Sequence, residues 1–440
     1  MRIARAASPR NQELGLLILA ALITSGAYAL ASLGRTASLP ADIGPFLGAV
    51  FALILVAHLA LRYFVPLADG TLLPIAALLN GIGFVFIARL KHRLAAPQAT
   101  WTGVGIAAFV VTLWLVKRPR DLQRYRYSFA LVGLILLMLP VFFGPTINGA
   151  RNWLKIGPFT FQPGEVAKIA LAIFFASYLV EKKELLSTAT RRVGKVMLPD
   201  LKHFAPILGA WLVSLAVMAR GGDLGSALLF FSFFVVVLYV ATGRGIYLGI
   251  GALMTIAGGY IAYMTFAHVR VRVTTWLDPW PYADDKGIQL VQSMFAMGSG
   301  GVAGSGLGLG DPTKIPVAYT DFIFAAIGEE LGLLGSVAVL TAYLVLVGVG
   351  LRIALRSLNQ FEKLLATGLT AVIGLQSFII IAGVIRVIPL TGITLPFVSY
   401  GGSSLVTNYV LLALLLRISS SEQVDHAERN PNLDPEEAYA

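Results

Sequence analysis

The chain repeats long apolar stretches, and this feature constrains its fold more than any other. A helix needs roughly 20 apolar residues to cross a bilayer. Soluble domains carry about 25% charged residues, whereas this chain of 440 residues is 57% hydrophobic and 13% charged. We therefore predict an all-α polytopic membrane protein with about twelve transmembrane helices. The candidate stretches lie at 14–34, 47–66, 71–90, 101–117, 126–144, 162–180, 204–220, 223–242, 245–266, 320–350, 361–388 and 400–417.

Composition excludes several classes of function. The net charge of +11 is spread over short loops between apolar stretches, which predicts positive-inside topology rather than nucleic-acid binding. The absence of cysteine excludes disulfides and thiolate chemistry. The five histidines do not cluster as metal ligands, and no Ser/His/Asp set is recognisable. The first apolar run follows Arg2, Arg5 and Arg10 and lacks a clear cleavage site, so we interpret it as a membrane span.

Lysine and arginine in the loops predict the orientation of the chain. They concentrate at 117–126, 181–203 and 351–363, and twelve spans with a cytoplasmic N-terminus place all three loops inside. Loop 267–319 then lies outside, and the polar segment 418–440 becomes a disordered cytoplasmic tail. Three basic residues do not fit this orientation, because it places them outside. We interpret them as part of an amphipathic segment on the outer leaflet. This group comprises Arg89, Lys91 and Arg93.

Loop 267–319 is the richest segment of the chain. It carries Arg270 and Arg272, then the run Trp276 to Trp280, and later a glycine-rich stretch at 298–310. Tryptophan and arginine are typical of an interfacial loop. The glycines would also let the backbone approach a ligand closely, and local sequence does not decide between the two interpretations. The glycine-rich stretch is not a P-loop, because no Gly-Lys-Ser/Thr follows it.

Carboxylates also lie near hydrocarbon, where they are costly and usually functional. Asp321 opens an apolar run that contains Glu329 and Glu330. Thr320 or Asp321 could cap the following helix, and position alone favours that interpretation. The helix dipole would also keep Asp321 ionised and able to accept a proton.

Three further motifs begin predicted helices. Glu165 and Lys168 are spaced i, i+3, which predicts an ion pair that lowers the cost of burial and is compatible with a cavity. Asp223 follows two glycines, and we expect it to cap the next helix in a tight external turn. The segment 396–404 fits either a re-entrant turn that lines a cavity or a simple glycine-rich helix entry.

In order along the chain, these motifs resemble the SEDS family (shape, elongation, division and sporulation proteins), whose members include RodA and FtsW. The resemblance covers about residues 70–417, and Gly298 to Gly301 is more similar to RodA members. The matching pieces are Gly149-Ala150-Arg151-Asn152-Trp153, Gln162-Pro163-Gly164-Glu165-Val166-Ala167-Lys168, Asp223-Leu224-Gly225-Ser226, Trp276-Leu277-Asp278-Pro279-Trp280, Gln289-Leu290-Val291-Gln292-Ser293, Gly298-Ser299-Gly300-Gly301, Thr320-Asp321-Phe322-Ile323-Phe324, Gly328-Glu329-Glu330-Leu331-Gly332 and Pro396 through Ser404.

The resemblance implies a ten-helix core at 67–417, so the helix pair within 1–66 is an addition to it. It implies a peptidoglycan glycosyltransferase that polymerises lipid II at the outer face of the bacterial cytoplasmic membrane. Asp321 matches the family's essential aspartate, and Glu165 and Lys168 match its Glu–Lys pair. The implied partner is a class B penicillin-binding protein, a transpeptidase.

A β-1,4 bond formed from an α-linked donor requires inversion in one displacement, hence a base and positive charge on the departing pyrophosphate. Asp321 is the candidate base. The candidate pyrophosphate contacts are Lys314, Arg151, Arg220, Arg270 and Arg272. The other candidate substrate or cavity residues are Glu165, Lys168, Trp153, Gln162, Asp223, Thr320, Glu330, Ser399, Tyr400, Gly401 and Gly402. A divalent cation such as Mg²⁺ could share the charge, although no dedicated cage is visible.

Two alternatives belong to other classes. Many spans with intramembrane charges also fit a lipid II flippase or another transporter of lipid-linked oligosaccharides. A non-catalytic scaffold for cell-wall enzymes would tolerate Asp321→Ala. Membrane lipids are expected contacts in every case.

Overall fold

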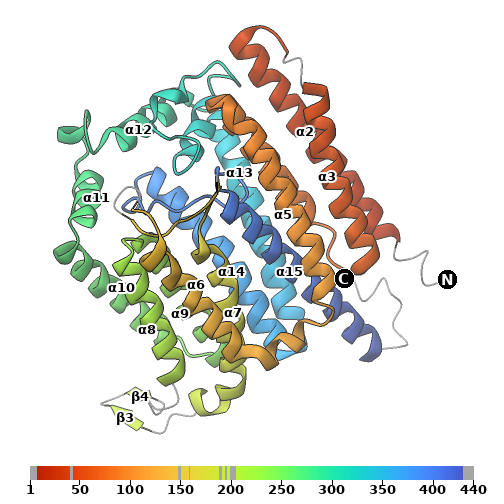
Figure 1. The fold of residues 1–440 in the computed structure, drawn as a ribbon, viewed down its shortest axis with the longest axis vertical. Coiled ribbons are helices and arrows are strands. Elements are labelled where there is room, and N and C mark those ends of the chain that lie inside the picture. The colour runs from red at the N-terminus through yellow and green to blue at the C-terminus, as the bar shows by residue number, and fades with distance from the viewer. Residues whose placement is uncertain are drawn as a thin grey trace.

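The structure, a computed structural model, describes residues 7–39, 43–146, 150–157, 159–187, 191–193, 196–198 and 205–429. Within these ranges the chain forms a bundle of α-helices with two small hairpins (Figure 1). The helices are α2 (Ala7–Thr36), α3 (Ile43–Phe64), α4 (Leu72–Leu90), α5 (Ala95–Leu115), α6 (Arg126–Phe143), α7 (Pro163–Ser187), α8 (Ala205–Arg220), α9 (Leu224–Thr242), α10 (Ile246–Thr265), α11 (Ala267–Leu277), α12 (Ile288–Gly300), α13 (Ile323–Arg356), α14 (Gln360–Val384) and α15 (Gly402–Arg429).

Short elements connect the helices. The 3₁₀ turns in the described ranges are η1 (His92–Leu94), η2 (Pro119–Tyr125), η4 (Trp280–Tyr282) and η5 (Pro312–Lys314). Strand β1 (Leu154–Ile156) pairs antiparallel with β2 (Phe159–Phe161), and β3 (Arg191–Val193) pairs antiparallel with β4 (Val196–Leu198).

Each of the twelve predicted stretches corresponds to a helix, and the chain is a polytopic membrane protein. Eleven helices in the described residues are long and apolar enough to span a membrane. The twelfth, α8, has 16 residues, and its apolar part, Trp211–Arg220, is shorter than a span. Two further helices, α11 and α12, lie in the predicted loop 267–319.

The centre of the bundle is formed by α4, α7, α14 and α15, which are largely buried, whereas α6 and α10 are mostly exposed. Aromatic rings fill the contact between α7 and α9, where Phe175 packs against Phe233 and Phe234. In a bilayer the exposed apolar side chains of the outer helices face lipid tails, which are as apolar as leucine.

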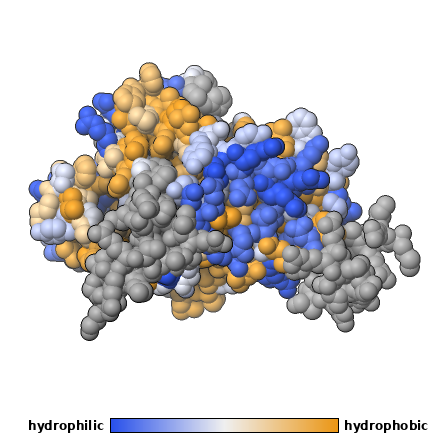
Figure 2. Space-filling model, turned by 90° about the horizontal axis from the view of Figure 1, so that it is seen from below, coloured by the Kyte–Doolittle hydropathy of each residue, from blue (hydrophilic) through white to orange (hydrophobic). Residues whose placement is uncertain are grey.

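The two ends of the bundle differ. The end that carries α12 and Asp321 is called the Asp321 end below. At the opposite end, Arg10 donates to the Ala68 carbonyl, and the amide of Asp69 donates to Ser419 Oγ at 3.1 Å. The described N- and C-terminal parts of the chain therefore meet there. Figure 2 views the molecule from below and shows hydrophilic residues gathered from the middle of the face to the right, with hydrophobic residues mainly to the left.

Two predicted segments differ from the structure. The predicted span 320–350 begins at Ile323 and is broken at Gly332, whose φ of 66° is left-handed. The break frees backbone groups, and Leu333 N–H donates to the Gly301 carbonyl at 2.9 Å. The segment 418–429, predicted to be disordered, is helical in α15. Residues 1–6 and 430–440 of the predicted terminal segments lie outside the described residues.

The N-terminal helix pair packs on the core at two places. Helix α2 packs against α4, and α3 packs against α5, at the right edge of Figure 1. Near the Asp321 end, a side chain added at Gly34 would collide with the Leu307 carbonyl. Near the opposite end, Glu13 is paired with Arg10 and lies 2.6 Å from His58 Nδ1. The pair is thus fixed at both ends.

Candidate active site

The segment 391–401, which is part of the connection between α14 and α15, organises the site. The Thr391 carbonyl accepts a hydrogen bond from Arg272 Nη1 of α11 at 2.8 Å. Ser399 Oγ donates to the Thr320 carbonyl at 2.6 Å, and the amide of Tyr400 donates to the Tyr319 carbonyl at 2.9 Å. This one segment therefore holds both α11 and the residues that precede α13.

Asp321 lies in this arrangement and does not cap α13. The helix begins at Ile323, and its N-cap, Phe322, has no side-chain capping bond, so the capping interpretation is wrong. Asp321 is half-buried. A Cβ atom at Gly392 would lie 3.1 Å from Arg272 Nη2 and 3.7 Å from Asp321 Oδ2. The cation and the carboxylate therefore converge on a backbone position that carries no side chain.

Burial raises the pKa of Asp321 to about 6, although the charge of Arg272 and a hydrogen bond from Thr320 act in the opposite direction. Burial lowers the pKa of Arg272, while the carboxylates of Asp321 and Asp223 raise it. Arg272 is thus a cation that two carboxylates influence. A carboxyl group whose pKa approaches neutrality is well matched to proton abstraction at physiological pH.

The predicted pair of Glu165 and Lys168 is present in α7. Glu165 Oε2 lies 2.8 Å from Lys168 Nζ, and the two side chains are only 8% and 4% exposed. Lys168 Nζ also donates to Gln376 Oε1 of α14 at 2.8 Å, and Gln376 Nε2 donates to the Thr394 carbonyl at 2.7 Å. Because an ammonium group can only donate, Gln376 must turn its oxygen to Lys168 and its nitrogen to Thr394. The ion pair is thereby linked to segment 391–401.

Asp223 caps α9, as expected. Its carboxylate accepts from the Ser226 amide at 3.0 Å and from Asn152 Nδ2 at 3.0 Å. Arg151 and Gln162 lie near it, and both line a small cavity among α6, α7, α8 and α9 with Asp223. The amide of Gln162 donates to Ser403 Oγ at 2.9 Å.

Glu330, predicted to be a cavity residue, is instead tied to the chain itself. Its side chain is fully buried, 3.1 Å from Arg89 Nε, and it accepts from the Gly308 amide at 2.9 Å. Glu329 accepts from the Asp311 amide at 2.7 Å. The glycine-rich stretch therefore cradles two carboxylates of its own chain. Arg89 turns into the bundle to meet Glu330, so it does not belong to the outer-leaflet segment predicted from its charge.

Several predicted residues are exposed to solvent or contact other groups. Lys314 is exposed and pairs with Asp311 at 3.3 Å. Arg270 is exposed and donates to the Met264 carbonyl at 3.0 Å. Arg220 is exposed at the end of α8, and Trp153 is half-buried before β1. After Gly401, Gly402 packs so closely on the Trp101 ring that a side chain would collide, which favours a tight helix entry.

Sequence reasoning missed Gln376, Thr394 and Arg386. Gln376 has a detectable signal, because it is a polar residue inside an apolar span. Arg386 lies near the end of the predicted stretch 361–388, where a basic residue is ordinary, and Thr394 lies outside the predicted stretches, so neither has such a signal. Within the described residues, no three His, Asp or Glu side chains gather as a metal site.

The chain is similar to known proteins over most of its length. Residues 70–424 match the family model for FtsW, RodA and SpoVE, described as "Cell cycle protein". The chain is 44% identical to the peptidoglycan glycosyltransferase RodA of Mycobacterium tuberculosis (strain ATCC 25618 / H37Rv) over 435 residues, 96% of this chain and 92% of that protein. It is 45% identical to the protein of the same name from Mycobacterium leprae (strain TN) over 437 residues, 97% and 94% of the two chains.

A solved structure has the same fold. It is described under "Structural coordination of polymerization and crosslinking by a peptidoglycan synthase complex". The TM-score is 0.66 at 28% identity, over 81% of this chain and 98% of that chain.

Proposed function

Because this chain belongs to the FtsW/RodA/SpoVE family, we propose that it is a peptidoglycan glycosyltransferase that polymerises lipid II into β-1,4 glycan strands. Its similarity to two RodA proteins over nearly their whole length favours a role in cell elongation. The observation that carries the proposal is the half-buried Asp321 carboxylate, which converges with Arg272 at one end of a membrane bundle.

The chemistry assigns a role to each of these side chains. Asp321 accepts the proton of the acceptor sugar hydroxyl as that oxygen attacks the anomeric carbon of the donor. The polyprenyl pyrophosphate leaves from the opposite face, which inverts the anomeric centre. Arg272 supplies positive charge to the pyrophosphate, since a preorganised cation stabilises charge that develops in the transition state. Arg151 lines the cavity next to Asp223 and is a second candidate contact.

A divalent cation such as Mg²⁺ is not assigned a step. Asp223 and Asp321 both act electrostatically on Arg272, and this guanidinium would repel a divalent cation bound close to it. Metal dependence is tested by comparing polymerisation in EDTA with polymerisation after Mg²⁺ is added back.

We place the Asp321 end at the outer face of the bacterial cytoplasmic membrane. Basic residues of loop 117–126 lie at the opposite end, where Arg120 pairs with Asp425 of α15 at 3.3 Å, and the positive-inside rule assigns that end to the cytoplasm. Both termini are then cytoplasmic. Accessibility of cysteines introduced at Asp278 and Lys117 to an impermeant thiol reagent tests this orientation.

The partner we propose is a class B penicillin-binding protein. The similar solved structure belongs to a peptidoglycan synthase complex that coordinates polymerisation with crosslinking, and this chain has no Ser-x-x-Lys with the companion motifs of a transpeptidase. Co-purification from native membranes should recover a single-span transpeptidase that raises the polymerisation rate. A chain that runs at full rate alone and does not bind the transpeptidase would contradict this.

The decisive experiment uses purified protein and lipid II in detergent. A polymerase makes glycan strands without a second compartment, whereas a flippase moves lipid only in sealed vesicles. The buried Glu165–Lys168 pair lends little support to a transport path, because its side chains are almost completely enclosed. Lipid translocation in vesicles without strand synthesis in detergent would replace the proposal with the transporter alternative.

A further inference from the structure

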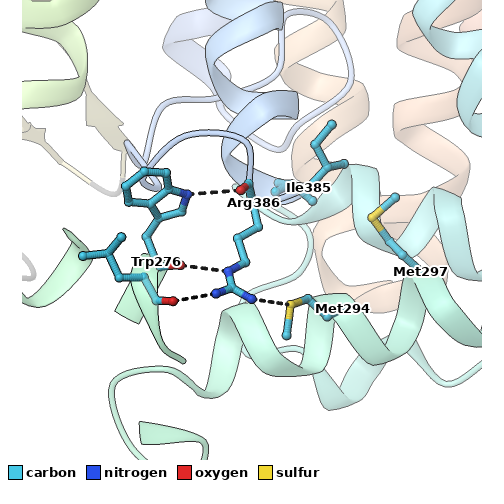
Figure 3. Close-up of a pocket in the computed structure, with 7 residues that line it drawn as sticks. Trp276, Met294, Met297, Ile385 and Arg386 are labelled. Carbon is cyan, nitrogen blue, oxygen red and sulfur yellow. Dashed lines mark hydrogen bonds between the residues drawn. The ribbon is translucent and has the colours of Figure 1, made fainter. Parts of the chain in front are cut away.

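We infer that Arg386 is a positioning residue for this reaction: it caps the C-terminus of α11 and so holds Arg272 beside Asp321. The inference rests on the proposed function. Figure 3 shows the contact, in which the Arg386 guanidinium lies against the end of α11 and beside Met294 of α12.

The hydrogen bonds are reciprocal. Arg386 Nε donates to the Trp276 carbonyl at 2.8 Å, and Arg386 Nη2 donates to the Leu277 carbonyl at 2.7 Å. Trp276 Nε1 in turn donates to the Arg386 carbonyl at 3.1 Å. The last carbonyls of a helix have no partner within it, and a cation there also interacts favourably with the helix dipole. We call these three bonds the Trp276–Arg386 clasp.

The backbone conformation at Arg386 would favour glycine, which indicates that the arginine side chain has a role. Its φ is 62°, in the left-handed region that favours glycine. The amide of Arg386 donates to the Gly383 carbonyl at 3.2 Å, and the amide of Val387 donates to the Ala382 carbonyl at 2.8 Å. This pair of bonds is the Schellman motif, whose left-handed position is usually glycine. A strained arginine at a glycine position points to a function for its side chain.

The clasp acts on Arg272 through helix geometry. Arg272 and Trp276 are four residues apart and lie on the same face of α11. Trp276 is held by Arg386, and Arg272 is held by the Thr391 carbonyl, so α11 is fixed to the α14–α15 connection at two points one turn apart. Without the clasp, only the bond from Arg272 to the Thr391 carbonyl would fix α11 to this connection.

The clasp lines a pocket of about 630 Å³, bordered by Met294, Met297 and Ile385 among others (Figure 3). The pocket lies between α11, α12 and the end of α14. Among the described residues, its apolar walls form no directional bond to α11, whereas the clasp forms three.

The test compares Arg386→Gly with Ala37→Gly. Both replace a residue with left-handed φ by glycine, so both ease the backbone, but only the first removes a clasp. We expect Arg386→Gly to lower the polymerisation rate roughly 10- to 100-fold, the cost of misplacing a catalytic group by about 1 Å. Ala37→Gly should leave the rate unchanged. Arg386→Lys and Trp276→Phe should have intermediate effects, because a lysine cannot form the fork and a phenylalanine lacks the indole N–H.

The pH profile distinguishes positioning from general damage. Arg272 lowers the pKa of Asp321, so its displacement should move the acidic limb of the rate profile to higher pH. The other titratable groups that face Arg272 are Asp223 from α9 and His268 from α11, and neither contacts Arg386. Arg386→Gly should shift the limb, and Ala37→Gly should not.

A distance measurement tests the clasp without activity. The chain has no native cysteine, so spin labels can be placed at Asp278 and Phe378, both of which are exposed. Arg386→Gly should broaden the distance distribution between them. A wild-type rate and acidic limb in Arg386→Gly, or a lost rate with an unchanged distribution, would overturn the inference. If the wild-type chain makes no glycan, the proposed function fails, while the distance distribution still decides on the clasp.

Discussion

Two pairs of acidic and basic side chains differ in how far the protein encloses them and supplies their contacts. Glu165 and Lys168 contact each other directly, are almost fully buried, and are bonded onward through Gln376. Asp321 and Arg272 converge on a glycine and remain half-buried. A pair that is almost enclosed by protein offers little surface to a substrate, whereas a half-buried pair can be reached by one. We therefore assign a structural role to Glu165 and Lys168, and a catalytic role to Asp321 and Arg272.

The strongest test of this comparison is whether polymerisation requires Asp321. We expect Asp321→Asn to lower polymerisation by about 10²–10⁴-fold, the usual cost of losing a general base, with folding and insertion intact. Glycan synthesis from purified lipid II measures this. Asp278→Asn, an exposed aspartate in the same outer region, is the matched control. Near wild-type synthesis by Asp321→Asn would show that the carboxylate is not the base.

Glu165→Ala and Lys168→Ala test the closed pair. Each single change leaves a buried charge unpaired, at a cost of about 3–5 kcal/mol, so yield and melting temperature should fall. The double change should cost less than the sum of the two. Removing Arg120, which is 47% exposed and pairs with Asp425, should cost no more than about 1 kcal/mol. Strict additivity would mean that Glu165 and Lys168 do not interact.

Gln376→Leu tests the link between the two regions. It leaves the Thr394 carbonyl and one Lys168 donor without their partner, at a cost of about 1–3 kcal/mol. Thermal unfolding and polymerisation rate should both decline. Gln98 is an equally buried glutamine whose amide atoms have no hydrogen-bond partner among the described residues, so Gln98→Leu should not be destabilising. Equal behaviour of the two variants would remove Gln376 from the network.

The pH dependence is the smallest expected effect. The pKa of Asp321 is about 6, and a base must be ionised to accept a proton. The rate should therefore be constant above that pH and fall about tenfold per unit below it. In Asp321→Asn the residual rate should lack this limb. A wild-type profile that is flat down to about pH 4, the ordinary range of a carboxyl group, would contradict the assignment of Asp321 as the base.

Hydropathy was sufficient to predict the fold, because each span must satisfy its own backbone in lipid. The break at Gly332 was not predictable, because it depends on Leu333 and Leu334 finding carbonyls in the glycine-rich stretch. The helix at 418–429 was also not predicted. Its charged composition is typical of disorder, but the segment continues the buried helix α15.

The site was predictable as a set of residue types but not as a set of contacts. Asp321, Glu165 and Lys168 stand out because charge in an apolar span is costly. The pairing of Glu330 with Arg89 joins residues about 240 positions apart, and neither residue's neighbours indicate it. Arg386 lies near the end of the predicted stretch 361–388, and only its backbone angle shows that it occupies a position that favours glycine.

The N-terminal helix pair also has a consequence for biosynthesis. Helices α2 and α3 leave the ribosome before α4 and α5, the helices against which they pack. Glu13 of α2 lies against His58 of α3, which accepts from the exposed Arg62, so the buried carboxylate has a partner within the hairpin and the two helices can remain in the bilayer as a unit. Its contact with Leu307 forms only after two thirds of the chain has been made. Docking of Gly34 is then a late step of assembly, and a truncation before residue 307 should remove this contact while the packing of α2 on α4 remains.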